Sequence, residues 1–252
     1  MYKIPASTLF TGKNLVYVPE CHSTNTLLAE LMQKAETPEG TLVITDHQTA
    51  GRGQRGNTWQ ATIGLNFTMS LLLKPKFLPV KDQFYLQRVV ALGLTDYLQL
   101  YFDDDAKIKW PNDILIKGKK VCGILIENQL SGAYLSQSIA GVGLNVNQKV
   151  FALPAATSMA LMSGTEFDLS LELEKLLLKL EQRYLQLKQN KQEQLKADYL
   201  QRMYWRKEVH WFAAAGREFE GTITGTDEMG LLQMESREGV RTFDVKEVTY
   251  VK

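Results

Sequence analysis

The sequence predicts an α+β fold, in which a β-sheet with helices packed on it is followed by a small all-β barrel. Two observations support this prediction. As far as about residue 205, segments with an apolar residue at every second position alternate with segments of helical spacing. Beyond it only short strand-like pieces follow, punctuated by Gly216, Gly230 and Gly239. We therefore expect two domains, over residues 1–205 and 206–252.

Apolar periodicity indicates the elements of the larger domain. In the helix expected first, Leu27, Leu28 and Leu31 share one face, and in residues 65–71 apolar and polar side chains alternate strictly, as in a half-buried strand. The elements expected up to residue 102 are a strand at 14–18, a helix at 24–35, strands at 41–48 and 65–71, and a helix at 80–102.

The same reasoning applies to the rest of the chain. After residue 102 we expect a short strand ending at Lys109, a hairpin of strands 114–116 and 121–126, another strand ending at Gly143, and a long helical region over 168–204 that is broken or loosened at 190–194. The barrel is expected to contain strands at 208–212, 219–226, 231–234 and 240–243.

Composition and charge exclude several classes of protein. With 252 residues, 44% of them apolar, the chain can bury one large core and a small satellite. Its formal charge of +1 gives no electrostatic footprint for nucleic acid. No apolar stretch approaches the roughly 18 residues of a membrane span, and no signal core opens the chain. We expect a cytoplasmic protein without nucleic-acid or membrane partners, in which Cys122 is a buried thiol and no protein metal site exists.

The most informative segment is Gly51–Trp59, with the sequence GRGQRGNTW, which we call the glycine loop. It matches the glycine pattern of dinucleotide-binding folds, but a strand rather than a helix is expected to follow it, so that interpretation fails. A phosphate-binding loop fails too, because Asn57 stands where that loop has its lysine. The three glycines permit close backbone approach, and Arg52 and Arg55 supply forked donors. The segment therefore predicts a loop that wraps around an anion.

The glycine loop has little apolar surface to bury. Between Thr49 and Thr58 no apolar residue is larger than Ala50, so ordering the empty loop would cost roughly 1 kcal/mol or more per residue with little return. We expect this loop to be mobile when empty and ordered by an anionic ligand.

Two further segments combine strand ends with polar side chains. Alternation places Lys107 and Lys109 on the face opposite Ile108, and Pro111 stops this strand. Residues 141–145, with the sequence GVGLN, end another strand with two glycines and an amide. Taken singly, each segment also fits an ordinary turn or a solvated strand end.

Taken together and in this order, the segments resemble the biotin protein ligase family. The matching segments are Ser23-Thr24-Asn25, Gln48, the glycine loop, Lys109–Asp113, Lys120–Glu127 and Gly141–Asn145, and the resemblance covers nearly the whole chain. It implies a class II synthetase or biotin ligase-like catalytic domain, which is a mixed sheet with helices on one side, followed by an SH3-like barrel. About 14 residues precede the first strand, too few for the DNA-binding domain of some members, so a monofunctional type is expected.

This resemblance implies an activity. Biotin would be adenylated by ATP to biotinyl-5′-AMP and pyrophosphate, and then transferred to one lysine of a biotin carboxyl carrier protein. Magnesium would arrive on the ATP phosphates. A homodimer is among the assemblies that the resemblance allows.

Roles for individual residues follow from the resemblance. Lys109 and Arg52 are the catalytic candidates, because biotin's carboxylate and the α-phosphate repel each other and cations must offset that repulsion. The residues implied to bind biotin are Ser23, Thr24, Asn25, Gln48, Arg52, Gly53, Gln54 and Lys109. Those implied to bind ATP or the adenylate are Gly51, Gln54, Arg55, Asn57, Trp59 and Asn145.

Some of these assignments have alternatives. Residues 23–25 also fit a helix N-cap, and Trp59 fits a core position as well as stacking near the adenine. Gln54 stands where several family members carry an arginine. A lipoate protein ligase would share fold and chemistry, but its arginine and triple-glycine signature is absent from this sequence. A non-catalytic binding module for biotin or nucleotide stays open, although Lys109 argues against it.

Overall fold

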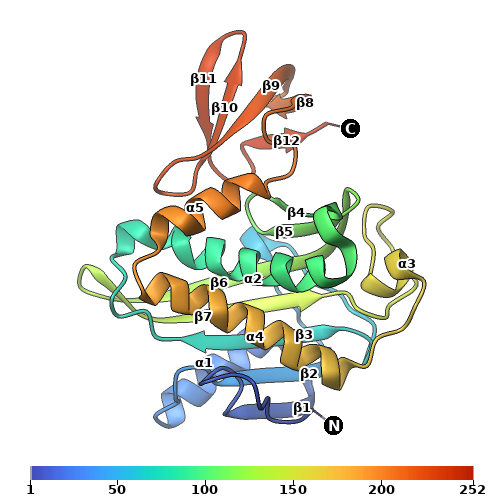
Figure 1. Cartoon of the computed structure of the whole chain (residues 1–252), viewed down its shortest axis with the longest axis vertical. Coiled ribbons are helices and arrows are strands. Elements are labelled where there is room, and N and C mark those ends of the chain that lie inside the picture. Colours follow the sequence, from blue (N-terminus) through green and yellow to red (C-terminus); the bar gives the residue numbers. More distant parts are fainter. Residues whose placement is uncertain (1, 252) are drawn as a thin grey trace.

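The computed structural model describes residues 2–251, which form two β-sheets of unequal size with helices around the larger one (Figure 1). The large sheet has seven strands in the order β1-β2-β3-β7-β6-β5-β4. Only β1 and β2 pair in parallel, so the sheet is mixed, as predicted. Its strands are β1 (Leu15–Cys21), β2 (Leu42–Gln48), β3 (Phe67–Leu73), β4 (Ala106–Lys109), β5 (Asp113–Ile116), β6 (Lys119–Ser131) and β7 (Tyr134–Leu144).

The helices agree largely with the apolar periodicity. They are α1 (Thr24–Lys34), α2 (Phe84–Phe102), α3 (Met159–Ser163), α4 (Leu169–Lys188) and α5 (Gln192–Gln201). The expected break in the long helical region lies between α4 and α5, where Asn190 adopts a left-handed φ of 58°. The short helix α3 was not predicted.

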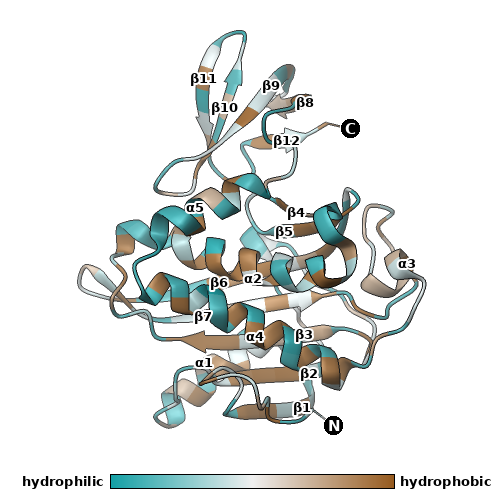
Figure 2. Cartoon of the chain, viewed as in Figure 1, coloured by the Kyte–Doolittle hydropathy of each residue, from teal (hydrophilic) through white to brown (hydrophobic). Residues whose placement is uncertain are grey.

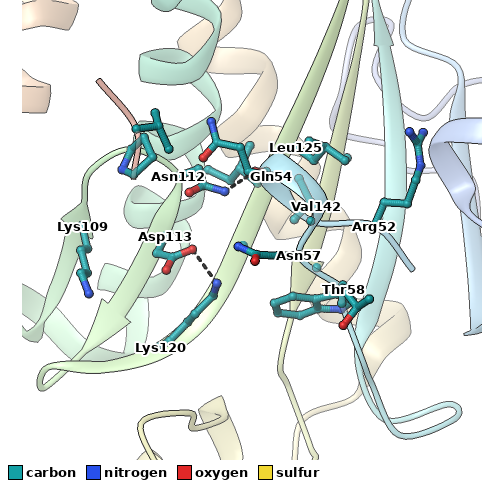
Figure 3. A pocket seen from close by; sticks show the side chains of 18 of the residues that line it. Arg52, Gln54, Asn57, Thr58, Lys109, Asn112, Asp113, Lys120, Leu125 and Val142 are labelled. Atoms are coloured by element: carbon teal, nitrogen blue, oxygen red, sulfur yellow. Dashed lines mark hydrogen bonds and ion pairs between the residues drawn. The ribbon is translucent and has the colours of Figure 1, made fainter. Parts of the chain in front are cut away.

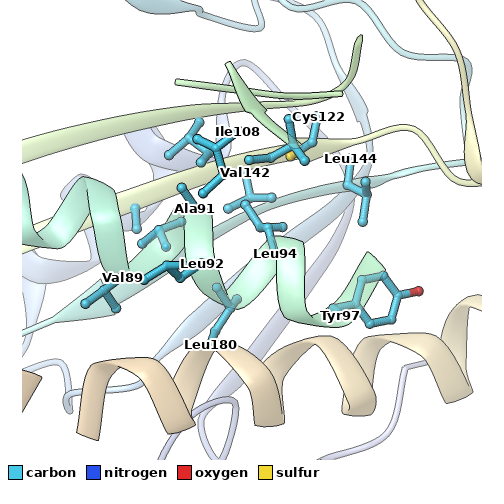
Figure 4. Close-up of a cluster of buried hydrophobic side chains, with 14 of the residues drawn as sticks. Val89, Ala91, Leu92, Leu94, Tyr97, Ile108, Cys122, Val142, Leu144 and Leu180 are labelled. Atoms are coloured by element: carbon cyan, nitrogen blue, oxygen red, sulfur yellow. The ribbon is translucent and has the colours of Figure 1, made fainter. Parts of the chain in front are cut away.

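The large sheet is covered on both faces, which corrects the expectation of helices on one side. The main core contains apolar residues of α2 and α4, such as Leu92 and Leu180 (Figure 4). On β2, Leu42 and Ile44 belong to this core, whereas Val43 belongs to a second cluster. That second cluster contains Leu28 and other apolar residues of α1. Because the four consecutive residues 42–45 of β2 are buried, both faces of this strand need a cover there, and α1 supplies the second one. Cys122 is fully buried in the main core, as predicted.

A second sheet follows the helices. It has five antiparallel strands in the order β11-β10-β9-β8-β12, and we call it the C-terminal sheet. Four of its strands were predicted, namely β8 (Val209–Ala214), β9 (Arg217–Thr226), β10 (Leu232–Ser236) and β11 (Gly239–Phe243), whereas β12 (Val248–Tyr250) was not.

Buried polar contacts join the C-terminal sheet to the rest of the molecule. The Trp110 indole nitrogen donates to the Gly230 carbonyl at 2.8 Å, and the Arg88 guanidinium of α2 donates to Thr226 Oγ1 at 3.1 Å. Apolar residues concentrate in the strands of the large sheet and on the inner faces of its helices (Figure 2). Within residues 2–251, no helix has the length and apolar character that crossing a membrane requires.

Candidate functional site

A pocket of about 450 Å³ opens on the face of the large sheet that carries α1, next to the C-terminal sheet (Figure 3). This volume falls within the range of roughly 300–1,000 Å³ that is common for small-molecule sites. Ten of the predicted site residues line it, namely Ser23, Thr24, Asn25, Gln48, Arg52, Gly53, Gln54, Asn57, Trp59 and Lys109. Segments that are far apart in the chain therefore meet in one cavity, as the resemblance implied.

The floor of the pocket is one row of paired residues across five strands. Thr68 pairs with Gly143, Gly143 with Gly123, Gly123 with Asp113, and Asp113 with Lys109. All five residues line the pocket. Since the second and third residues of the row are glycines, this part of the floor is bare backbone, and the charged side chains of Asp113 and Lys109 stand at one end of the row.

Trp59 forms a wall above this bare backbone. A Cβ atom added at Gly143 would lie 2.2 Å from Cε2 of the indole, and one at Gly123 would lie 3.1 Å from its Cζ3. The indole nitrogen is buried and has no hydrogen-bond partner in the described protein. Trp59 is half-buried and lines the pocket, which argues against a core position, whereas stacking near the adenine stays a prediction.

The start of α1 presents a buried polar cluster to the pocket. Ser23 occupies the N-cap position, but its side chain makes no capping hydrogen bond, which limits the capping interpretation to the backbone. The Thr24 amide donates to Gln48 Oε1 at 2.8 Å. The Ser70 hydroxyl lies 2.7 Å from Thr24 Oγ1 and donates to Asn25 Oδ1 at 2.5 Å. Gln48 and Ser70 thus hold the two α1 side chains in place.

Glu127 connects the α1 cluster with the glycine loop. Its carboxylate accepts a forked pair of hydrogen bonds from Arg52, at 2.9 and 2.8 Å, and a third from Asn25 Nδ2 at 2.7 Å. Arg52 is thereby fixed on the side of the pocket away from Lys109 in Figure 3. A bidentate pair holds the guanidinium plane in one orientation, so Glu127 decides where Arg52 presents its remaining donors.

A β-bulge turns Lys120 into the pocket. Ile114 pairs with Cys122, but Leu115 pairs with Lys120, so β6 has one extra residue, Val121. Val121 and Cys122 are both fully buried in the main core. The extra residue restores Lys120 to the pocket face, where its ammonium lies 2.6 Å from Asp113 Oδ1 and 5.7 Å from the centre of the Trp59 ring.

Lys109 meets the C-terminal sheet inside the pocket. Its ammonium lies 4.5 Å from the centre of the Tyr250 ring, a cation–π distance. The Tyr250 hydroxyl is buried and makes no hydrogen bond within the described protein, and burial raises the pKa of Tyr250, so the phenol stays neutral. The structure also confirms that Lys107 and Lys109 are half-buried on the face opposite the buried Ile108.

Three predicted residues do not line the pocket. Gly51, the first residue of the glycine loop, is buried, and a Cβ atom added there would lie 2.3 Å from the Trp59 carbonyl oxygen. The Arg55 guanidinium instead contacts Asp244 of the C-terminal sheet. Asn145 is buried and donates to the Thr157 carbonyl at 2.9 Å. Binding of the nucleotide by these three residues stays a prediction.

Sequence reasoning assigned no role to several residues that line the pocket. They include Asp113, Lys120, Gly123, Gly141 and Gly143 of the large sheet, and Val245, Lys246, Val248, Thr249 and Tyr250 in β12 and the turn before it. The first group lies inside matched segments and could have been found there, whereas the second had no sequence signal. No cluster of three or more His, Cys, Asp or Glu side chains suited to a metal ion occurs in the part of the chain that the structure describes.

Comparison with known proteins supports the resemblance. The model of the Biotin/lipoate A/B protein ligase family matches residues 17–145. The chain belongs to this family. Among its relatives in the family, the bifunctional ligase/repressor BirA of Bacillus spizizenii is 32% identical over 247 residues, covering 91% of this chain and 72% of BirA.

Two further members of the biotin/lipoate ligase family are similar over most of their length. A biotin--[acetyl-CoA-carboxylase] ligase of Mycobacterium tuberculosis is 31% identical, covering 87% of this chain and 82% of the relative. The solved structure of a biotin protein ligase from Aquifex aeolicus in complex with biotin and ATP superposes with a TM-score of 0.77 at 27% identity, covering 95% and 99% of the two chains.

Proposed function

We infer that this chain is a biotin protein ligase, which activates biotin with ATP and transfers it to a lysine of an acceptor protein. The observation that supports this most strongly is the pocket itself. One cavity holds the polar cluster Ser23–Asn25 suited to a small polar head group, the cations Arg52 and Lys109 suited to anions, and the Trp59 wall suited to a flat ring.

In the first step, an oxygen of biotin's carboxylate attacks the α-phosphorus of ATP. The bond from this phosphorus to the bridging oxygen breaks, and pyrophosphate leaves with the electron pair. Lys109 neutralises charge on the carboxylate and phosphoryl oxygens, and Arg52 clamps an oxygen with the donors that Glu127 orients. The protein contributes positioning and electrostatics and forms no covalent bond to the substrate.

In the second step, the neutral amine of the acceptor lysine attacks the carbonyl carbon of biotinyl-5′-AMP. AMP leaves, the amine loses a proton, and an amide remains. We propose a biotin carboxyl carrier protein as the acceptor, supported by the relative that is named a biotin--[acetyl-CoA-carboxylase] ligase.

Magnesium would enter with ATP. Asp113 is the carboxylate on the pocket floor, and Lys120 already engages it at 2.6 Å. One such carboxylate fits an ion held mainly by phosphate oxygens and water, since magnesium commonly keeps several waters. Bound magnesium would offset charge on the departing pyrophosphate.

We also propose that residues 1–205 form the catalytic domain and residues 206–252 the C-terminal domain. Two bridges support this boundary: Met203 pairs with Ile108 of β4, whereas Arg206 pairs with Ile223 of β9. The outermost residues of both domains, 1 and 252, lie outside the described chain.

The free cysteines Cys21 and Cys122 favour a location in the reducing cytoplasm. Assembly as a homodimer stays a prediction, which analytical ultracentrifugation can test.

Substrate choice is the direct test of this function. Biotin is expected to support exchange of labelled pyrophosphate into ATP, and lipoate or octanoate is not, because the Ser23–Asn25 cluster offers a polar head group several hydrogen-bonding side chains. Exchange is measured with each acid alone at matched concentrations. Activity with lipoate and none with biotin would contradict the proposed function.

Tyr250 is expected to assist Lys109. Replacing the ring by leucine should slow pyrophosphate exchange about threefold to tenfold, the range expected for loss of a partly desolvated cation–π contact. Tyr250→Phe is the matched control, because it keeps the ring and removes only a hydroxyl that has no partner. If phenylalanine slows exchange as much as leucine does, the ring is not the group that matters.

A further inference from the structure

The turn between β11 and β12 of the C-terminal sheet binds the tip of the glycine loop through one ion pair and two further hydrogen bonds. Arg55 Nη2 lies 2.7 Å from Asp244 Oδ1, and Arg55 Nη1 donates to the Val245 carbonyl. In the opposite direction, the Lys246 ammonium donates to the Arg55 carbonyl at 2.7 Å. The loop and the turn therefore each provide one cationic side chain, and each also provides the oxygen atoms that bind the cation of the other. The contact is reciprocal. We call Asp244–Lys246 the clasp.

Local hydrogen bonds prearrange the clasp in the turn between β11 and β12. Asp244 Oδ1 accepts from the Val245 amide at 2.6 Å, and the Asp244 amide donates to Glu247 Oε2 at 2.7 Å. The Arg55 hydrogen bond holds the pKa of Asp244 below its usual range, so this carboxyl is charged at neutral pH. The turn therefore presents a fixed anion to the loop.

The backbone at the contact is unusual on both sides. Arg55 has φ 49° and Lys246 has φ 73°, left-handed values that side chains other than glycine rarely adopt. Such residues persist where surrounding contacts hold them, and here the two residues hold each other. Removing the contact should let the loop tip leave this conformation.

The clasp also lies on the rim of the pocket. Val245 and Lys246 line the same cavity as Gly53, Gln54 and Asn57 of the loop. Arg52 ties the loop to β6 through Glu127, and Arg55 ties it to the C-terminal sheet. The side chains of Arg55 and Asp244 are 44% and 48% exposed, so solvent screens this pair and it can open and re-form.

We propose that Asp244 and Lys246 are positioning residues, which hold the glycine loop closed over biotinyl-5′-AMP until the acceptor lysine arrives. This inference rests on the proposed ligase function. It assigns to the turn between β11 and β12 the role of keeping the glycine loop closed. Arg55 then retains the intermediate indirectly, because its contacts with the clasp keep the glycine loop in place. This role accounts for the direction of its guanidinium, which faces the clasp.

The test compares Asp244→Asn and Lys246→Met with Glu220→Gln. The control removes an exposed ion pair of the same sheet, Glu220 with Arg237, which does not line the pocket. Without acceptor protein, both clasp variants should release biotinyl-5′-AMP on the order of three to ten times faster than the wild type, the scale of a small ionic contact. Amides 51–58 should exchange hydrogen faster in the clasp variants, while the control matches the wild type.

Salt and conservative replacement separate positioning from general destabilisation. Raising the salt concentration should speed release from the wild type toward the rate of Asp244→Asn and leave that variant nearly unchanged, since salt screens exposed pairs. Asp244→Glu should restore part of the retention.

Wild-type rates of release and exchange in both clasp variants would overturn the inference. The proposed function is tested separately by biotin-dependent pyrophosphate exchange of the wild type. If that exchange is absent, the function fails, while hydrogen exchange of the ligand-free loop still reports whether the clasp holds it.

Discussion

Replacing Lys109 by methionine should slow biotin-dependent pyrophosphate exchange by about 100-fold or more, the scale lost when one electrostatic group is removed from a transition state. Lys109 ends the row of residues on the pocket floor and is half-buried there, and in the proposed mechanism its ammonium neutralises charge on the carboxylate and the α-phosphate. Methionine keeps the length and the apolar stem, so the unfolding temperature should hardly change. Initial exchange rates and thermal melts measure both.

Lys107→Met is the matched control for this experiment. Lys107 lies on the same strand and the same face, but it pairs with Asp104 at 2.5 Å and does not line the pocket. The Lys107→Met variant should therefore exchange pyrophosphate at nearly the wild-type rate. Equal losses in the two variants, or an unfolded Lys109 variant, would remove the specific role of Lys109.

Gly143→Ala should weaken ATP binding by roughly 10- to 100-fold, which corresponds to the 1–3 kcal/mol typical of overpacking a well-filled site. The new methyl group would lie 2.2 Å from Trp59 Cε2, so the indole must leave the pocket wall. The φ of Gly143 is not in the left-handed region, so alanine fits the backbone and the strand should persist. Calorimetric titration with a non-hydrolysable ATP analogue measures the effect.

A double-mutant cycle identifies the cause of that loss. In a Trp59→Ala background the methyl group at position 143 has no indole to displace, so Gly143→Ala should add little to the loss caused by Trp59→Ala alone. Simple addition of the two losses would show that Gly143 acts on the floor itself and not through Trp59.

The local sequence pattern was sufficient to predict features that depend only on alternation between neighbouring residues along the chain. The strict alternation of residues 65–71 predicted a strand that overlaps β3, but the expected half-burial is wrong, because every residue of β3 is buried. The alternation around Ile108 placed Lys109 on the correct face. The gathering of Ser23–Asn25 and Gln48 in one pocket with Lys109 came from the family resemblance and not from periodicity.

Features that depend on pairing between strands were missed. Uniform alternation along β6 puts Lys120 on the face opposite Gly123, and only the bulge in its pairing with β5 reverses this. The second face of β2 needs α1 as a cover, which no local pattern indicates.

Contacts over long separations were missed for a different reason. The Arg55 contact with Val245 joins residues 190 positions apart, and two arginines in a glycine-rich segment do not indicate which of them faces the ligand. Strand β12 is three residues long, too short for periodicity to indicate, yet it brings Tyr250 to Lys109. The predicted mobility of the empty loop stays a prediction, although its polar contacts with Glu127 and Asp244 supply a support that counting apolar residues overlooked.

The position of β12 has a consequence for the newly made chain. Domains fold from the amino end during synthesis, so the large sheet and α1 can form while later residues are still being added. The pocket, however, gains Tyr250 and the neighbouring residues of its wall only when the segment after Val245 has emerged from the ribosome and paired with β8. A nascent chain in which this segment has not yet paired with β8 therefore has an open, incomplete pocket, and we expect it to activate biotin more slowly than a chain in which Tyr250 has reached Lys109.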